Sequence, residues 1–245
     1  LGEDRYVVSA VPGTTRDAVD SILSYHGKTF RFIDTAGLRR KARVDDDVEF
    51  YSTVRTRRAI EEAQVSVLVI DAALGVHHQD LRIATEAWER GNGLVIAVNK
   101  WDLIEEKESN TAVRGHDIVV EKAPFLADVP FVYLSAKTGQ RARKVLDTIL
   151  EVAEARLRRI PTAEVNKVLE ALVARNQPPQ REGAEVKLLY ATQVTVAPPT
   201  FVLMSNRPDD VPEHYQRYLS RGFREAWGFA GVALRLKFRE RKSDR

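Results

Sequence analysis

Short apolar runs alternate with helical patterns over the first 160 residues of the chain. Residues 65–70 and 94–98 are rich in aliphatic and β-branched side chains, as expected of parallel strands that are buried on both faces. Two further strands are predicted at residues 29–34 and 131–134, and helices are predicted at residues 54–63, 79–90 and 143–159. This alternation predicts a doubly wound α/β sheet with helices on its faces.

The pattern changes after residue 160, where Pro161 interrupts a long helix. Thr162 is a candidate N-cap for the next helix, because a threonine hydroxyl can accept a hydrogen bond from the first turn. After a polar proline loop, the order strand, strand, helix, strand is predicted at residues 187–196, 200–205, 212–227 and 232–239. We therefore expect an incomplete α/β domain over residues 1–160 and a small α+β domain over residues 161–245.

Composition narrows the class of protein only a little. The chain of 245 residues is 44% hydrophobic and 30% charged, which is typical of a globular protein with a substantial core. No apolar run approaches the ~18 residues of a membrane-spanning helix, so no membrane span is expected. The absence of cysteine excludes disulfides and fits a reducing, cytoplasmic location. A basic excess after residue 160 permits a nucleic-acid partner without requiring one.

Four short motifs carry the candidate chemistry. Three of them each follow a predicted strand, and the fourth precedes the first strand: Asp34-Thr35-Ala36-Gly37, Asn99-Lys100-Trp101-Asp102, Ser135-Ala136-Lys137 and Pro12-Gly13-Thr14-Thr15-Arg16-Asp17. Ligands of doubly wound sheets bind beyond the C-terminal ends of the strands. Each motif alone is weak, but their order and spacing together are typical of a guanine-nucleotide site.

The most specific of these motifs is the one that would select the base. Asp102 can accept both the N1–H and the exocyclic amine of guanine, a donor pair that adenine lacks. Asn99 would tie neighbouring loops together, and the Lys100 stem would lie over the face of the ring. The backbone N–H of Ala136 would meet the guanine O6. The alternative is an ordinary polar loop after a buried strand.

The remaining motifs would serve the phosphates. Asp34 can hold a water bound to Mg²⁺, and Gly37 lets its N–H approach a phosphate oxygen. Thr15 is the candidate hydroxyl ligand of Mg²⁺. The alternatives are a strand-end turn for the first motif, and a turn before a helix cap or a strand for the second.

The phosphate loop that should precede these motifs is not found. The chain begins without Met and is expected to start inside a domain, with the loop carried by the intact protein. Residues 26–29 resemble the end of such a loop, but Ile22 stands where its first glycine is required. A strand also follows, where a phosphate-binding helix should begin. Gly27-Lys28 is therefore predicted to form a hairpin turn.

At these residues the chain resembles the Der (EngA) family of bacterial GTPases, which have two tandem G domains and a C-terminal KH-like domain. The matching segments cover nearly the whole chain: residues 13–17, 34–41, 49–52, 99–102, 135–139, 166, 177–179 and 228–229. The resemblance implies a Ras-like P-loop GTPase domain, truncated at its N-terminus, followed by the KH-like domain.

This resemblance also implies roles for the motif residues. Thr15 and Asp34 would bind the metal, Asp34 and Gly37 would face the phosphates, and the base side would be formed by Asn99, Lys100, Asp102, Ser135, Ala136 and Lys137. Leu38 stands where Ras-type enzymes carry a water-positioning glutamine, so no catalytic residue is assigned. The implied ligands are GTP or GDP, Mg²⁺ and, as a further candidate, K⁺. The implied partners are ribosomal RNA of the 50S subunit and the first G domain of the intact protein.

Two readings of the C-terminal domain remain open. Residues 228–231 spell the GxxG of an RNA-binding KH loop, but their place after a helix favours a C-cap and turn. Arginines 217, 221 and 224 share one helical face, and residues 235, 237 and 239 share one strand face. These faces are either a surface for RNA phosphates or ordinary solvated surface.

Two functions from different classes are therefore carried forward. The first is a GTPase that hydrolyses GTP to GDP and phosphate and acts as a switch in the biogenesis of the large ribosomal subunit. The second is a non-catalytic module that binds RNA or the ribosome and retains a vestigial or incomplete guanine-nucleotide site.

Overall fold

The computed structural model describes residues 9–10, 21–33, 56–104, 110–180 and 183–240. The chain divides into two compact units, Leu1–Gln64 and Val65–Arg245. The domain boundary that we predict at residues 160–161 lies inside the second unit, and it stays a prediction. None of the helices in the described part of the chain combines the length and the apolar character needed to cross a membrane.

The described part of the first unit contains a three-stranded antiparallel sheet. Its strands are β1 (Ser9–Ala10), β2 (Ser21–Tyr25) and β3 (Lys28–Phe32), and residues 56–62 form a helix. His26 and Gly27 make the two-residue turn with φ angles of 49° and 69°, as such hairpins require. The prediction of a hairpin at Gly27-Lys28 in place of a phosphate loop is confirmed, with Lys28 opening β3.

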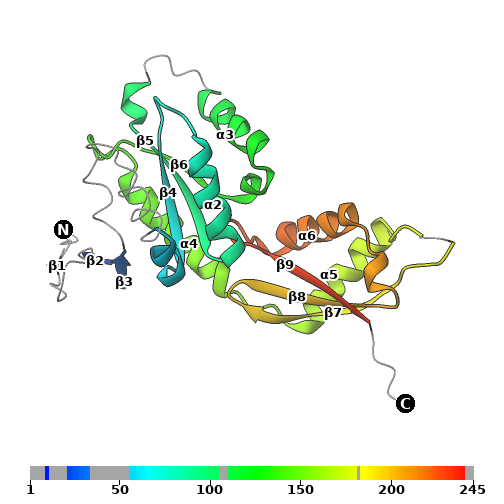
Figure 1. Cartoon of the computed structure of the whole chain (residues 1–245). Coiled ribbons are helices and arrows are strands. Elements are labelled where there is room, and N and C mark those ends of the chain that lie inside the picture. The colour runs from blue at the N-terminus through cyan, green and yellow to red at the C-terminus, as the bar shows by residue number, and fades with distance from the viewer. Residues whose placement is uncertain (1–8, 11–20, 34–55, 105–109, 181–182, 241–245) are drawn as a thin grey trace. The chain divides into compact units, whose positions relative to one another are not determined.

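The second unit begins with a parallel sheet in the order β4-β5-β6 (Figure 1). These strands are β4 (Val65–Asp71), β5 (Gly93–Asn99) and β6 (Phe131–Tyr133). The helices are α2 (His78–Arg90), α3 (Thr111–Lys122) and α4 (Ala142–Leu157), with short 3₁₀ segments η2 (Trp101–Leu103) and η3 (Pro124–Asp128). In Figure 1, α2 and α3 lie on one side of the sheet and α4 lies on the other. The predicted strands and the α/β class are confirmed.

The hydrophobic pattern does not predict helix α3. Gly115 lies in its interior, where glycine disfavours a helix. Two of its large apolar side chains, Val113 and Ile118, are 57% and 53% exposed, so its apolar residues do not mark a single buried face.

The C-terminal part of the second unit has the predicted order of elements. These are α5 (Thr162–Arg175), β7 (Leu188–Val196), β8 (Pro199–Ser205), η4 (Pro208–Asp210), α6 (Glu213–Trp227) and β9 (Arg235–Glu240). The sheet order is β7-β8-β9, with β8 antiparallel to β7 and parallel to β9. The prediction that Thr162 caps α5 is wrong: Pro161 occupies that position without a side-chain cap, and the Thr162 hydroxyl lies 3.1 Å from that of Thr192.

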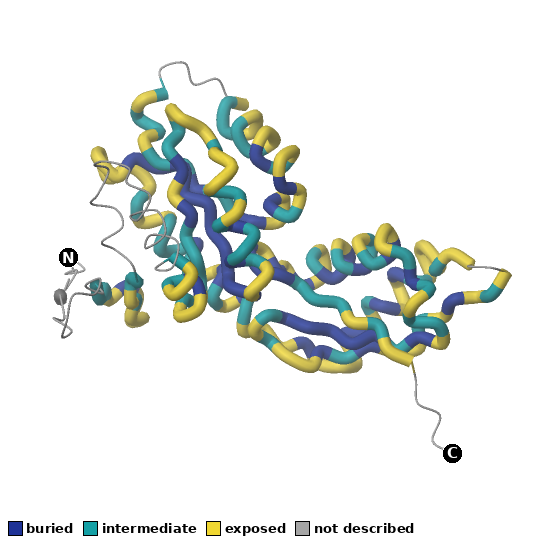
Figure 2. Tube along the Cα trace, in the orientation of Figure 1, coloured by how far each residue is buried: buried dark blue, intermediate teal, exposed yellow. Residues whose placement is uncertain are grey.

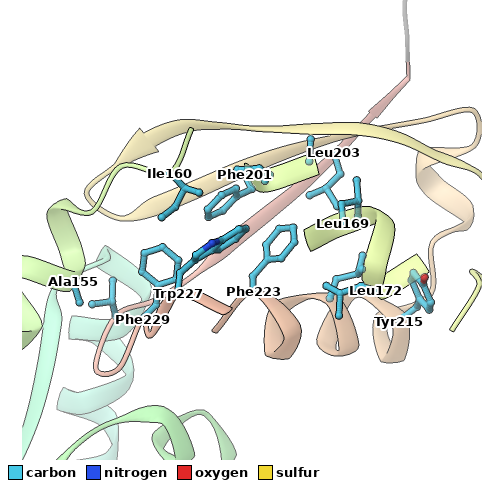
Figure 3. Packing of buried hydrophobic residues seen from close by; sticks show 14 of the residues in the cluster. Ala155, Ile160, Leu169, Leu172, Phe201, Leu203, Tyr215, Phe223, Trp227 and Phe229 are labelled. Carbon is cyan, nitrogen blue, oxygen red and sulfur yellow. The ribbon is translucent and has the colours of Figure 1, made fainter. Parts of the chain in front are cut away.

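One hydrophobic core runs through the second unit (Figure 2). Its centre is a group of aromatic rings between the mixed β7-β8-β9 sheet and α6, where Phe201 stacks on Trp227 with ring centroids 5.5 Å apart (Figure 3). Ile160 continues this group toward Val152 on α4 and Val95 on β5. The parallel sheet and the C-terminal elements therefore share buried surface.

The loop after α6 contacts the beginning of β5. Gly228 ends the helix with φ 64°, and its N–H donates to the Arg224 carbonyl at 2.7 Å, which confirms the predicted C-cap. Gly231 follows with φ 68°; its carbonyl accepts the Leu94 N–H at 2.8 Å, and its N–H donates to the Asp128 carbonyl at 2.7 Å. The residues spelled GxxG are thus a turn that packs against the parallel sheet.

The Arg224 side chain holds the same loop through two hydrogen bonds and also pairs with Asp128. Its guanidinium donates to the carbonyls of Phe229 and Val232 at 2.6 and 2.8 Å, and its Nε lies 3.0 Å from Asp128 Oδ2. The side chain is only 11% exposed. The expectation that Arg224 shares a solvent-facing surface with Arg217 and Arg221 is therefore wrong for Arg224, while the other two are exposed.

A buried carboxamide holds the connection between α4 and α5. Gln193 of β7 is almost fully buried; its Oε1 accepts the Ile160 N–H at 2.7 Å, and its Nε2 donates to the Arg158 carbonyl at 2.9 Å. The Arg158 guanidinium in turn donates to the Trp227 carbonyl. The linker is therefore fixed to both β7 and the end of α6.

Candidate nucleotide-binding site

The C-terminal ends of the three parallel strands lie at one edge of the sheet. Asp71, the last residue of β4, is in register with Asn99, the last residue of β5. The Leu134 N–H, just after β6, donates to the Val98 carbonyl at 2.9 Å. Two of the predicted motifs, residues 99–102 and 135–137, are thereby brought to adjacent loops at the edge where doubly wound sheets bind ligands.

Asn99 links these two loops directly. Its Oδ1 accepts the Ala136 N–H at 2.9 Å, a contact between residues 37 positions apart. Ser135 is fully buried, and its Oγ accepts the Thr138 N–H at 3.2 Å, which closes the turn that presents Ala136 and Lys137 to solvent. The Ser135 hydroxyl is thus engaged within its own loop, and Lys137 of the same loop is exposed.

Lys100 adopts an unusual backbone conformation at the mouth of the sheet. Its φ of 61° lies in the left-handed region, which non-glycine residues seldom occupy. Its Nζ lies 2.5 Å from Asp71 Oδ2, at the end of the neighbouring strand. The hydrogen bond from Lys100 is the main cause that lowers the pKa of Asp71 below its ordinary value, so this carboxylate is charged at neutral pH.

Asp102 lies in the short 3₁₀ turn that follows Lys100. The turn is held by hydrogen bonds from Leu103 N–H to the Lys100 carbonyl and from Trp101 N–H to the Leu134 carbonyl, both at 3.0 Å. The Oδ1 atom of Asp102 is buried, although the residue as a whole is partly exposed. A carboxylate with one sheltered oxygen is suited to a ligand that supplies hydrogen-bond donors.

Two aromatic side chains, one from this turn and one from β6, pack against each other. The Trp101 ring contacts the Tyr133 ring with centroids 4.6 Å apart, and the Tyr133 hydroxyl donates to the Ala112 carbonyl at 2.6 Å. Burial raises the pKa of Tyr133 above its ordinary value, so it stays a neutral donor. Sequence reasoning missed both Tyr133 and Asp71 as members of this edge, although each is the last residue of its strand.

The predicted phosphate side lies outside the described residues. This applies to Thr15, Asp34 and Gly37, and also to Leu38, so their assignments stay predictions. Among the residues that are described, no group of three or more His, Cys, Asp or Glu side chains is arranged to hold a metal ion. The described residues therefore offer a candidate base pocket only.

Comparison with known proteins defines the class. Residues 1–100 match the family described as 50S ribosome-binding GTPases, and residues 159–239 match the KH-domain-like family found at the C-terminus of EngA bacterial GTPase enzymes. A parallel α/β sheet with these loops at its edge, joined to a KH-like α+β domain, is thus a GTPase-class architecture. Both matched parts of the chain are thus similar to GTPases, and the C-terminal part matches the domain of the EngA (Der) enzymes.

Individual relatives agree with this assignment. The protein named GTPase Der from Gemmatimonas aurantiaca is 55% identical over 243 residues, which is 99% of this chain and 56% of that protein. GTPase Der from Lachnospira eligens is 44% identical over 242 residues, 99% of this chain and 55% of that protein. The chain therefore spans slightly more than half the length of the curated relatives it matches.

Proposed function

We propose that the protein binds guanine nucleotides, hydrolyses GTP to GDP and phosphate, and acts as a nucleotide-dependent switch in the biogenesis of the large ribosomal subunit. The observation that carries the proposal is the contact between Asn99 Oδ1 and the Ala136 N–H at 2.9 Å, which joins the loop of Asp102 to the loop of Ser135. Similarity to these GTPases supports the same activity.

The base-side chemistry follows from these positions. Asp102 would accept the N1–H and the exocyclic amine of guanine, and its partly buried carboxylate would be left without those donors by adenine. The Lys100 stem would cover one ring face. The Ala136 N–H donates to Asn99 in this structure, so guanine O6 would share that hydrogen or replace Asn99 as its acceptor. Lys137, next to Ala136, is exposed.

On the phosphate side we propose Thr15 and Asp34 for Mg²⁺ and Gly37 for the γ-phosphate. When bound, Mg²⁺ neutralises charge that develops on the phosphate oxygens during transfer. A K⁺ ion beside the phosphates is proposed from family resemblance alone. No catalytic side chain is assigned.

The proposed partners follow from the matched families. The description of one as ribosome-binding GTPases supports contact with the 50S subunit and its RNA, and the EngA-type KH-like domain supports the same setting. The length of the relatives supports a further G domain in the intact protein. We propose that this activity takes place in the cytoplasm.

One observation favours the second candidate function, a non-catalytic RNA-binding module. Lys237 and Arg239 are exposed on β9, on one face of the mixed β7-β8-β9 sheet. Calorimetry on the full-length protein separates the two functions. Micromolar GDP binding without ATP binding supports the GTPase, whereas salt-sensitive RNA binding that is indifferent to nucleotide supports the module.

The sharper test of the base site is Asp102→Asn in the full-length protein. The carboxamide presents a donor where guanine also donates, so GTP affinity should fall about 100-fold or more. The affinity for xanthosine triphosphate should fall far less. The matched control is Asp209→Asn, an exposed aspartate of η4, which should change neither. Equal losses for both nucleotides would reject the assignment of Asp102.

A further inference from the structure

Asp71 is a charged residue at the nucleotide edge that the proposed function does not use. It ends β4, sits in register with Asn99 across the sheet, and its side chain is only 17% exposed. Neighbouring strands lie about 4.8 Å apart, so its carboxylate faces the chain that leaves β5 toward Lys100 and Asp102. Its position indicates that Asp71 acts on the loop that carries Lys100 and Asp102.

The two oxygens of Asp71 have separate partners. Oδ1 accepts the Ala73 N–H at 3.0 Å, and the Asp71 backbone carbonyl accepts the N–H groups of Leu74 and Gly75 at 3.2 and 2.9 Å. This turn fixes the direction of the carboxylate. Oδ2 is then left to meet the Lys100 ammonium at 2.5 Å.

Lys100 depends on such an anchor because of its own geometry. The residue is 51% exposed, and a lysine stem in solvent samples many rotamers that must be given up on binding. Its backbone is left-handed, and its ammonium reaches Asp71 at the end of β4. With the ammonium held at Asp71, the four-carbon stem is extended across the mouth of the sheet before any ligand arrives.

We propose that Asp71 is a positioning residue of the nucleotide site: it holds the Lys100 ammonium so that the lysine stem is already placed against the purine ring. This role rests on the proposed function. Ordering the stem in advance removes an entropic cost from binding, so the effect falls on nucleotide affinity and residence time and leaves the chemical step alone. The hydrogen bond from Lys100 lowers the pKa of Asp71, and the Asp71 carboxylate carries the charge that this contact needs.

The test is Asp71→Asn in the full-length protein. The asparagine keeps an Oδ1 acceptor for the Ala73 N–H but removes the charge that holds Lys100. Release of a fluorescent GDP analogue, followed by stopped flow, should become about three- to tenfold faster. The single-turnover rate of GTP hydrolysis and the melting temperature without nucleotide should not change. Asp71→Glu, which keeps the charge, should restore part of the slow release.

A double-mutant cycle isolates the route through the lysine. In a Lys100→Met background, Asp71→Asn should change GDP release by less than twofold, because the group that it positions is gone. The control Asp209→Asn should release GDP at the wild-type rate. The proposal would be overturned if Asp71→Asn released GDP at the wild-type rate. It would also be overturned if the rate effects of the two substitutions multiplied in the double variant, because the two residues would then act independently.

Failure of this proposal is distinguishable from failure of the proposed function. If Asp102→Asn does not separate GTP from xanthosine triphosphate, the base site itself is misassigned. If Asp102→Asn does separate them and Asp71→Asn releases GDP normally, only the role of Asp71 is lost.

Discussion

The two ends of strand β5 differ in how they are held. At its beginning, Gly93 bridges to Val232 and Leu94 donates to the Gly231 carbonyl, with apolar side chains packed around them. At its far end, Asn99 accepts the Ala136 amide and Lys100 pairs with Asp71. The seven residues of β5 thus run from a close-packed backbone contact at one end to a set of partly exposed polar contacts at the other.

This difference separates residues that stabilise the fold from residues that can bind a ligand. Close packing leaves little room for adjustment, so any added atom at the beginning of β5 has to displace neighbours. Polar contacts at a partly exposed edge contribute modestly to folding and can be exchanged for contacts with a ligand. Substitutions at the first end should therefore unfold the protein, and substitutions at the second should mainly change binding.

The largest effect is expected from Gly231→Ala. A Cβ at this position would lie 2.7 Å from the Leu94 carbonyl oxygen and 2.7 Å from Val152 Cγ2, and φ is 68°. Strain and overpacking together should lower the free energy of unfolding by about 3 kcal/mol in urea denaturation. Gly183 has a similar φ of 74°, but a Cβ added there would meet no atom within 4 Å among the other described residues, so Gly183→Ala should cost about 1 kcal/mol. Equal losses would show that the close approach at β5 is unimportant.

A smaller loss of stability is expected when a buried tyrosine of α6, the helix before the Gly231 loop, ionises at high pH. Tyr215 of α6 is buried and donates to the Asn176 carbonyl at 2.6 Å; burial, and then Tyr218, raises its pKa from 10.0 to about 12. The unfolded chain loses this proton first, so stability should fall as pH rises from 10 to 12, by about 2 kcal/mol. The free energy of unfolding, measured across this pH range, should fall less in Tyr215→Phe than in the wild type. Identical slopes of that free energy against pH in the two proteins would contradict the burial effect.

The smallest change in stability is expected at the polar end. Asn99→Ala removes the acceptor of the Ala136 amide, which is exposed enough to bond water, so unfolding should change by under about 1 kcal/mol. GDP affinity measured by calorimetry should fall about tenfold, because the two loops are no longer tied. A stability loss as large as that of Gly231→Ala would erase the contrast between the ends.

The sequence was sufficient for the elements whose burial leaves a simple pattern. Residues 94–98 are apolar throughout because β5 is covered on both faces, and the predicted strand differs from β5 by one residue at each end. Motif order likewise predicted the resemblance to the Der (EngA) family, which the comparisons confirm. The base-side loops meet at one edge because parallel strands end together.

Features set by tertiary contact were not predictable in this way. Arg224 has the spacing of a surface arginine, and only the approach of Phe229, Val232 and Asp128 makes it an internal residue. Asp71 carries no motif of its own, since its role depends on the left-handed turn at Lys100. Helix α3 has too few buried positions to mark a face.

The carboxamide of Gln193 gives the linker at residues 158–161 a mechanical property. A four-residue connection would ordinarily act as a hinge, but here swivelling would break two hydrogen bonds made by a buried carboxamide, which are costly to lose. Torque applied to the β7-β8-β9 sheet would therefore pass directly into α4, and the C-terminal elements would turn with that helix as one rigid lever.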